Sequence, residues 1–473
     1  MVDGREIAAQ FEGAADFETR KVLCGGQLLT VLFLDGLTSG RDIAEQVLRP
    51  LAQMTDEARE EVLYTRALQG GVWCASVKEP ESTQQAAELL VNGFCVILFP
   101  KSGKALGCEV KTGEKRSPSP PETENTVKGA KDAFTETLRT NTSLVRRHLR
   151  TPGLRLAETV IGKRTLTKVT VCWIDRLTDP ELPRRMQERL SSIDIDGALS
   201  PAAIEEYVTG SRRTAFPLLE YTERTDHFCQ GLLDGQVGLL TDGLPLGYLA
   251  PVGLGRLMRS PEDRATDFFS ASMLRLLRYA ALGVSLLLPA LYAAMAMFHQ
   301  QMLPTKLLLS IIESKQNVPF STLLEVLGLL CAFELLQQAG LHLPQAVGTA
   351  VSIIGGLVVG TAAVDAKLVS PAALIVTASS GICGFTLPNR ELSDAVRLWR
   401  FVLTVLAGLW GLFGVTVGLL LLLTELAGLE SLGRSYLSPF GRAEVKGALV
   451  RPRLVRQKWR DGALKPMDDQ NQR

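Results

Sequence analysis

The stretch FVLTVLAGLWGLFGVTVGLLLLLT, Phe401–Thr424, contains no Asp, Glu, Lys or Arg from end to end. A helix needs about 20 mainly apolar residues to cross the hydrocarbon core of a bilayer, so this stretch is long enough to be a span. Three further stretches also lack charge: Ala280–Phe298, Leu343–Val364 and Leu368–Asn389. A single such stretch is compatible with a buried core helix, but four in succession predict an integral membrane protein.

Charged residues divide the 473-residue chain into contrasting parts. They are dense in residues 1–278, nearly vanish from 280 to 430, and return in a basic tail. The segment Met1–Gly13 lacks the apolar core of a secretory signal peptide, so we expect the charged N-terminal region to stay in the cytosol.

Two parts of the charged region resemble one another. Leu29–Leu37 and Lys168–Leu177 each have the composition of a strand that reaches an Asp, and a helical pattern follows each. Further on, Leu89–Leu98 and Leu232–Leu240 each place an Asn-Gly or Asp-Gly turn before an apolar strand. We therefore predict an α/β soluble N-terminal region of two similar subdomains, followed by an all-α multi-span transmembrane bundle.

Composition also predicts the domain boundaries. A segment rich in Pro, Ser and charge cannot bury enough apolar surface to fold, which marks a linker at 112–126. The expected division is 1–111, first α/β subdomain; 112–126, Pro/Ser-rich linker; 127–270, second α/β subdomain; 271–430, transmembrane helical domain; 431–473, basic cytoplasmic tail.

Two motifs in the second half have competing interpretations. Leu138–Arg150 ends in three arginines, and we interpret it as a basic helix with a solvated charged face. Asp194 and Asp196 in SSIDIDGALSP resemble paired carboxylates. The alternation that precedes the following Gly favours the end of a strand and a turn instead.

Polar residues and a proline interrupt the apolar region. The first span, Leu274–Phe298, has Pro289 near its middle, a helix break tolerated where neighbouring helices or water satisfy the freed carbonyl. Val318–Gly340 is apolar but contains Glu325 and Glu334, which lie nine residues apart. They fall on nearly opposite sides of a helix, so we expect this segment at the interface, re-entrant or lining a wet interior. Whether it spans the membrane stays open.

Small residues recur at four-residue spacing in the second charge-free stretch: Gly348, Ser352, Gly356 and Gly360. Such residues share one helix face, which therefore carries almost no side-chain bulk. Close helix–helix packing explains this face. A ring of such helices around a narrow pore is the functional alternative.

Lys and Arg near the span ends predict the orientation. Five arginines between 256 and 278 precede the first span, and seven Lys or Arg between 442 and 460 follow the last. Both ends are then cytoplasmic, which requires an even number of crossings, and four fits. Arg390, Arg397 and Arg400 conflict with this model because four spans place them outside.

Motifs of enzymes and of metal sites are absent from the sequence. It contains no G-x-x-x-x-G-K-[ST] phosphate loop, no H-E-x-x-H and no G-x-S-x-G elbow. Eight cysteines are scattered without metal-ligand spacing, and we expect them to be reduced. We predict no enzymatic activity, no cofactor, no metal and no nucleic-acid partner.

From about Val127 to the end, the chain resembles the A subunit of GerA-type spore germination receptors. The matching stretches, in chain order, are VKGAKDAFTETLRTNTSLVRRHL, SSIDIDG, IEEY, FPLLEYTERTD, LLDGQVGLLTDG, RSPEDR, YAAMAMFHQQMLP, VPFSTLLEVLGLLCAFELLQQAGLHLP, SIIGGLVVGTAAV and YLSPF. The resemblance implies a multi-pass protein in the inner membrane of a dormant endospore. It also implies a ring-shaped, possibly pentameric, ligand-gated ion channel that acts with a transporter-like B subunit and a lipoprotein C subunit.

The four-residue spacing and the carboxylates in an apolar segment suggest the hypothesis that these residues have roles in such a channel. The face of Gly348, Ser352, Gly356 and Gly360 would line a constriction that gates by dewetting, and Glu325 and Glu334 would attract cations in a vestibule. A non-conducting scaffold or signalling subunit is the alternative. A solute transporter is the weakest reading, because the membrane part shows no internal repeat.

Overall fold

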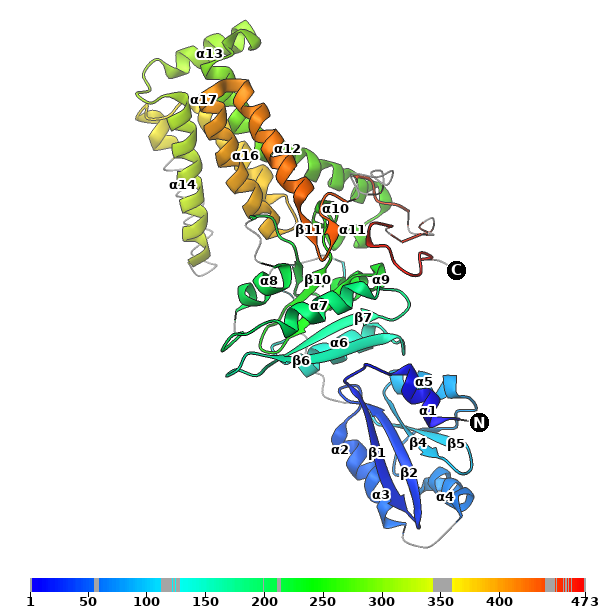
Figure 1. Ribbon diagram of the computed structural model, residues 1–473. Helices are drawn as coiled ribbons and strands as arrows, with labels where there is room; N and C mark the ends of the chain where they lie inside the picture. Colours follow the sequence, from blue (N-terminus) through cyan, green and yellow to red (C-terminus); the bar gives the residue numbers. More distant parts are fainter. Residues whose placement is uncertain are drawn as a thin grey trace.

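The computed structural model describes residues 2–54, 59–111, 121, 124, 128–198, 200–210, 214–342 and 360–438, and, in the tail, 447, 449–453, 455, 457, 459–460 and 462–471. Its parts follow one another along a single axis (Figure 1). The first α/β subdomain is at the end that carries the N-terminus, the second lies in the middle, and a helical bundle forms the other end. The tail returns toward the second subdomain.

The first subdomain contains an antiparallel five-stranded sheet in the order β1-β2-β4-β5-β3. Its strands are β1 (Phe17–Cys24), β2 (Gln27–Leu34), β3 (Val77–Lys78), β4 (Phe94–Phe99) and β5 (Lys104–Glu109). One face is covered by α2 (Gly40–Asp42), η1 (Ile43–Leu48), α3 (Arg49–Gln53), α4 (Glu60–Arg66) and η2 (Ala67–Gly71), and the other by α1 (Gly4–Gln10) and α5 (Thr83–Val91). Since helices pack on both faces, every residue of β4 is buried.

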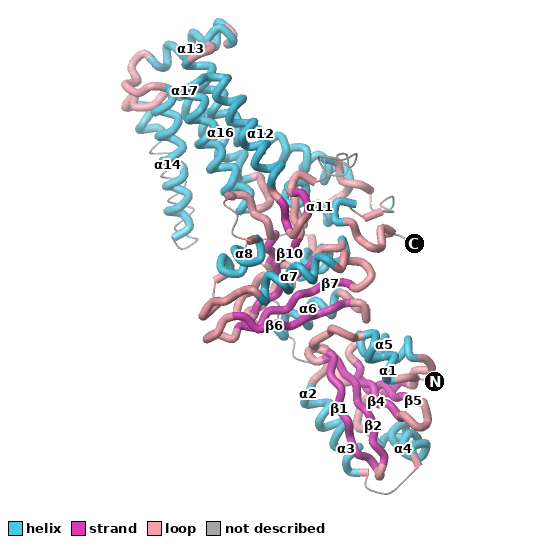
Figure 2. Tube along the Cα trace, in the orientation of Figure 1, coloured by secondary structure: helices cyan, strands magenta, loops and turns pink. Residues whose placement is uncertain are grey.

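The second subdomain repeats this topology, with the order β6-β7-β9-β10-β8. Its strands are β6 (Leu154–Ile161), β7 (Thr167–Ile174), β8 (Glu220–Thr222), β9 (Val237–Thr241) and β10 (Gly247–Ala250). The helices α7 (Glu181–Ser191) and α8 (Pro201–Thr209) cover one face, and α6 (Leu138–His148) and α9 (Thr225–Asp234) cover the other (Figure 2). The predicted pair of similar α/β subdomains is confirmed.

The turn signals that indicated the repeat occupy equivalent positions. In each subdomain a helix, α5 or α9, ends at a glycine with positive φ before the central strand begins. Gly93 has φ +81° and Gly235 has φ +101°, a region that glycine enters without steric cost. The Asn-Gly and Asp-Gly pairs therefore mark the same helix-to-strand turn in both copies.

The two subdomains meet through α6, where the predicted solvated face holds for Arg147 and Arg150, which are exposed, but is wrong for Arg146. Arg146 lies on α6, and its side chain is only 1% exposed rather than solvated. Its Nε and Nη2 donate to the two carboxylate oxygens of Asp16 at 2.7 and 2.8 Å. The basic helix faces the first subdomain because that subdomain supplies a buried carboxylate.

The segment around Asp194 and Asp196 is also not as predicted. It forms a loop rather than the end of a strand. This loop packs on the β6–β7 turn, where Lys163 N donates to Ile195 O at 2.9 Å and Lys163 Nζ lies 2.5 Å from Asp194 Oδ1. Both carboxylates are exposed ion-pair partners, since Asp196 Oδ2 lies 3.3 Å from Arg164 Nε.

The bundle is joined to β10 by α10 (Leu254–Leu257) and α11 (Glu262–Ala265). Its helices are α12 (Phe268–Met297), η3 (Gln300–Met302), α13 (Thr305–Lys315), α14 (Thr322–His342), α16 (Pro371–Phe385) and α17 (Arg390–Gly428). Three described helices are long and apolar enough to cross a membrane: α12, α14 from Thr322 to Ala339, and α17. A short hairpin of β11 (Glu430–Ser431) and β12 (Arg434–Ser435) follows, and η5 (Gly462–Leu464) lies in the tail.

The helix α17 reverses direction at Gly411, so Phe401–Thr424 is not the single crossing that its composition predicts. Gly411 has φ +61° and ψ −141°, outside the helical region. A Cβ on Gly414 would lie 1.9 Å from Leu406 O, and one on Gly418 2.5 Å from Leu403 Cδ2. Residues fifteen apart in a straight helix are about 22 Å apart. The arms 390–410 and 412–428 therefore lie side by side.

This reversal removes the conflict over the arginines before the last span. The turn at Gly411 lies against His299, just beyond the far end of α12, whereas Arg390 is within electrostatic reach of Tyr221 in the second subdomain. Both ends of α17 consequently face the second subdomain. Two other predicted spans differ from the structure or are not described by it. The helix in Leu368–Asn389 is the shorter α16, and most of Leu343–Val364 lies outside the described residues.

Candidate functional site

Two sets of ion pairs, most of their members buried, lie between the second subdomain and the bundle. Arg256, in α10, is the central cation. Its Nε donates to Glu220 Oε2 of β8 at 2.7 Å, and its Nη1 donates to Asp234 Oδ2 at the end of α9 at 2.9 Å. His227 Nε2 lies 2.9 Å from the other oxygen of Glu220. One guanidinium thus connects two elements of the subdomain to the segment that leads into the membrane.

The second set is connected to the first through the backbone between Asp263 and Arg264, and it reaches the first span. Arg264, in α11, donates to Asp234 Oδ2 at 3.0 Å. Asp263, 2% exposed, accepts from Arg275 Nη2 at 3.2 Å and from Arg278 Nη1 at 2.9 Å, and both arginines belong to α12. We call Glu220, Asp234, Arg256, Asp263, Arg264, Arg275 and Arg278 the junction network.

Neighbouring cations keep Glu220 and Asp234 ionised. Burial alone would raise the pKa of Glu220, but Arg256 and then His227 hold it well below its usual range. For Asp234, Arg264 and Arg256 likewise outweigh burial and lower the pKa. A buried charge is tolerated when it is paired, so the network stays intact at neutral pH.

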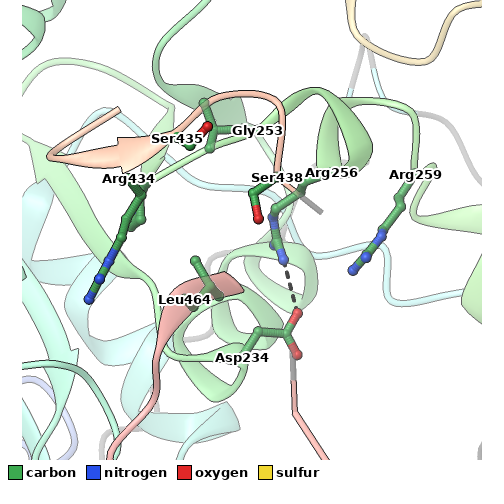
Figure 3. A pocket seen from close by; sticks show the side chains of 10 residues that line it. Asp234, Gly253, Arg256, Arg259, Arg434, Ser435, Ser438 and Leu464 are labelled. Carbon is green, nitrogen blue, oxygen red and sulfur yellow. Dashed lines mark hydrogen bonds and ion pairs between the residues drawn. The ribbon is translucent and has the colours of Figure 1, made fainter. Parts of the chain in front are cut away.

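A small cavity of about 40 Å³ lies beside the network (Figure 3). Asp234 and Arg256 face one another there, while Arg434, Ser435 and Ser438 enter from the segment after α17. Pockets for small molecules measure about 300–1,000 Å³, whereas a water needs only about 10–15 Å³. This cavity has room for water at the junction but not for a nutrient-sized ligand.

The hairpin after α17 forms a second contact between the bundle and the second subdomain. Ser431 Oγ donates to Leu218 O at 2.6 Å and accepts from Val252 N at 3.0 Å. The second subdomain is therefore tied both to the start of α12 and to the end of α17. Movement of the subdomain would act on both helices.

The two predicted vestibule carboxylates are paired within the chain. Glu325, on α14, is 2% exposed; it accepts from the backbone N–H of Ser370, and its Oε2 lies 3.3 Å from Lys315 Nζ. Glu334 Oε1 accepts from Arg397 Nη1 of α17 at 2.8 Å. Both glutamates therefore join α14 to neighbouring segments of the bundle.

One buried cation of the bundle escaped the sequence analysis. Arg400, on α17, is 1% exposed, and its Nη1 donates to Ser380 Oγ of α16 at 3.1 Å. Ser380 Oγ in turn donates to Ser285 O of α12 at 2.7 Å. Within the described part of the chain, Nε and Nη2 of Arg400 have no hydrogen-bond partner. Arg400 directly precedes the charge-free stretch Phe401–Thr424, which is the sequence feature that points to burial. The four-span model instead places Arg400 in a loop.

Of the remaining predicted site residues, the structure describes Pro289 and Gly360. Gly348, Ser352 and Gly356 lie outside the described residues, whereas Gly360 is buried, and a Cβ there would lie 3.6 Å from Leu374 on α16. Pro289 is a buried interior residue of α12. The described residues form no cluster of His, Cys, Asp or Glu able to hold a metal, and all eight cysteines are free.

Comparison with known proteins identifies the family. Residues 5–466 match the family described as Bacillus/Clostridium GerA spore germination protein. The chain belongs to the GerA family. It is 36% identical over 445 residues to the uncharacterized membrane protein YfkQ of Bacillus subtilis (strain 168), covering 93% of this chain and 86% of that protein.

Further GerA relatives have names that refer to germination. The chain is 34% identical to spore germination protein KA of Bacillus subtilis (strain 168) over 456 residues, 94% of this chain and 83% of that protein. It is also similar to the crystal structure of the N-terminal domain of the A subunit of the Bacillus megaterium spore germinant receptor GerK3. That match has 24% identity and a TM-score of 0.41, and covers 52% of this chain and 92% of that domain. By its family model and these relatives, the chain is a membrane protein of the GerA family of spore germination proteins.

Proposed function

We propose that this chain is the A subunit of a nutrient receptor in the inner membrane of the endospore. In this proposal, copies of the chain assemble into a pentameric ring that conducts ions when the receptor is engaged. A transporter-like B subunit and a lipoprotein C subunit complete the receptor. The N-terminal region and the tail face the spore core, and the domains divide at 112–126, 271 and 431.

The observation that carries the proposal is the set of ionisable groups within an apolar bundle. Glu325 pairs with Lys315, Glu334 pairs with Arg397, and Arg400 is buried among three helices. Charged groups inside membrane segments are costly and mark ion pathways or moving parts. A bundle that served only as an anchor would have no need of them.

The junction network supplies a route for gating. Because Arg256 and Asp263 connect the second subdomain to the start of α12, a rotation of the subdomain would pull directly on the first span. Ser431 connects the same subdomain to the end of α17. A paired, buried network favours discrete alternative arrangements over gradual deformation.

The candidate pore surface is the face of Gly348, Ser352, Gly356 and Gly360. Small side chains on one face would produce a narrow, weakly polar constriction when several copies meet, and such constrictions can gate by dewetting. Glu325 and Glu334 would attract cations at its entrance once their partners within the chain move away.

One contact favours the alternative, a non-conducting scaffold or signalling subunit. Gly360 packs close to Leu374 of the same chain, as expected if the small face serves helix packing. Transport of a solute is a further possibility for a membrane component of this size.

Reconstitution separates these functions. The purified chain would be placed in liposomes loaded with a potassium-sensitive dye, and flux compared for wild type, Gly356→Leu and a matched control, Gly328→Leu. Gly328 is exposed on α14 and a Cβ there meets nothing within 4 Å, so the control adds the same bulk without a clash in the chain. A conducting ring predicts flux, at least when the junction pairs are weakened to open it, that persists with the control substitution and that Gly356→Leu abolishes while assembly is unchanged.

The contrary results are equally specific. Absence of flux, even in variants with weakened junction pairs, supports the scaffold. Loss of assembly in Gly356→Leu, seen by size-exclusion chromatography, assigns the small face to packing.

A further inference from the structure

The tail crosses the junction between the second subdomain and the bundle. On the membrane side, the guanidinium of Arg451 donates to Arg264 O at 3.4 Å and also to Thr266 O, at the turn between α11 and α12. Arg453 lies over the ring of Phe268, the first residue of α12, with its guanidinium carbon 5.1 Å from the ring centroid. These contacts fix the tail to the segment that enters the first span.

Further along, the tail is attached to the second subdomain. Arg460 Nε donates to Leu233 O of α9 at 3.0 Å, and Met467 N donates to Leu177 O, in the turn after β7, at 2.8 Å. The tail therefore holds both sides of the junction. We call its described residues 459–460 and 462–471 the strap.

Arg460 gives the strap its shape. Its backbone N–H donates to Asp469 O at 2.8 Å, and its Nη1 donates to Asp468 O at 2.7 Å. Trp459 and Gln470 form an antiparallel bridge, so the strap closes on itself around the side chain of Arg460, which is only 13% exposed. One guanidinium thus holds the loop together and attaches it to α9.

Leu464 places the strap against the junction network. It is buried, and it lines the small cavity beside Asp234 and Arg256 (Figure 3). The strap therefore limits the access of water to this ion pair. Because an ion pair is stronger in a low dielectric than in water, cover at this point strengthens the link between α9 and α10.

Few apolar contacts hold the strap in place. Leu464 is the one buried apolar group among the strap side chains that the structure describes, whereas Trp459 and Met467 are 62% and 61% exposed. A segment with few buried apolar contacts opens locally at a small cost in free energy, without unfolding of the domain beneath it. The strap is thus able to leave the junction while the rest of the fold persists.

We propose that the tail is a releasable strap that holds the second subdomain against the start of the membrane bundle. When docked, it links α9 and the turn after β7 to α11 and α12, and it covers the pair of Asp234 and Arg256. Its release exposes this pair to water and allows the subdomain to move relative to α12. The inference concerns the coupling of two parts of the chain and does not depend on conduction.

Hydrogen–deuterium exchange of the full-length chain in detergent at pH 7.5 tests the strap. Arg460→Gln removes the guanidinium bonds to Leu233 O and Asp468 O, so the tail amides are expected to exchange about tenfold faster. The junction amides of Gln236, after α9, and Met258, after α10, are both hydrogen-bonded within the chain. If the junction opens only after the strap leaves, these two amides accelerate by the same factor.

A chain that lacks residues 459–473 is the second variant, and it should accelerate the junction amides at least as much. Lys465→Gln is the matched control. Lys465 is an exposed residue of the strap, so this substitution removes a positive charge from the same loop but leaves the bonds of Arg460 in place. The amides of β4, in the first subdomain, report overall stability and should keep wild-type exchange in every variant.

The proposal is overturned if the wild-type tail amides exchange as fast as those of a synthetic peptide of residues 459–471, since the tail would then be undocked. It is also overturned if both variants free the tail while Gln236 and Met258 keep wild-type exchange. A parallel acceleration in β4, or an equal effect of Lys465→Gln, would overturn it as well, because overall stability or charge would then account for the result.

Discussion

Arg146 and Asp16 form a two-pronged ion pair across the boundary of the two subdomains, with side chains only 1% and 2% exposed. The pair is separated by 130 residues of sequence. Since each charge has been removed from water, neither is tolerated without the other.

Asp16→Ala should destabilise the contact between the subdomains by about 3–5 kcal/mol, because it leaves Arg146 buried and unpaired. The double substitution Asp16→Leu with Arg146→Met should restore most of the loss. Thermal unfolding of the purified chain would measure both. Glu45→Ala is the control: its exposed pair with Arg41 predicts a change of about 0.5 kcal/mol or less. Equal effects at the two sites would contradict the buried pair.

The junction network should weaken in acid. The pKa of Glu220 is lowered in the folded chain, so its contribution to stability is complete above the unfolded value of about 4.3 and is lost as the pH falls through the folded pKa. Glu220→Gln should lower the melting temperature at pH 7 and flatten its decline below pH 5. Exposed Glu61 on α4 offers a control, Glu61→Gln, expected to change neither quantity. An unchanged acid profile in Glu220→Gln would exclude this role.

His148 and Asp132 predict a second pH dependence, of opposite sign. The hydrogen bond to Asp132 raises the pKa of His148, so its contribution is complete below the unfolded value of about 6.5 and is lost as the pH rises through the folded pKa. The same bond lowers the pKa of Asp132 to about 2. His148→Gln should remove the stability loss on the alkaline side. Melting temperatures between pH 6 and 9 would show it, and Asp132→Asn should give the same result.

Gly411 should tolerate no side chain. Its φ of +61° with ψ of −141° is a conformation almost confined to glycine, and a Cβ would lie 2.7 Å from the His299 ring. Gly411→Ala is expected to cost about 1–3 kcal/mol through the backbone alone. Gly428→Ala, at the end of the same helix with nothing within 4 Å, is the control for adding a methyl group. Similar melting temperatures for the two variants would contradict the reversal.

The reversal also predicts membrane topology. In a cysteine-free background, Thr386→Cys and Glu430→Cys should react with a membrane-impermeant maleimide from the side of the soluble region. Gln301→Cys, in η3 beyond α12, should react only from the opposite side. Labelling of Thr386→Cys and Glu430→Cys from different sides would restore a single crossing by α17.

The sequence allowed prediction of whatever depends on local pattern. The repeat was recognisable because Gly93 and Gly235 occupy the same turn, and the membrane region because charge disappears over whole helices. The reversal at Gly411 was not predictable, because Gly411, Gly414 and Gly418 look like a packing face whether the helix continues or turns. The backbone of Gly411 and the contacts of Gly414 with Leu406 and of Gly418 with Leu403 distinguish the two.

Partners that lie far apart in the chain were also missed. Arg146 resembled any arginine on an exposed helix until Asp16 was placed beside it. Glu334 and Arg397, 63 residues apart, were assigned to different environments although they form one ion pair. Glu205 of α8 and Glu391 of α17 line one cavity although 186 residues separate them. Pattern analysis evaluates each charge against its neighbours in sequence, whereas burial and pairing are set by tertiary contacts.

The linear arrangement of the two α/β copies limits how a conformational change in the first subdomain can reach the transmembrane helices. The copy nearer the N-terminus contacts its twin through Arg146 and Asp16, and among the described residues the links to α12 and α17 come from the twin (Figure 1). A molecule captured by the outer copy therefore has to deform the inner one before any transmembrane segment responds. Responsiveness to such a molecule should vanish when the twin is made rigid, even if capture itself is untouched.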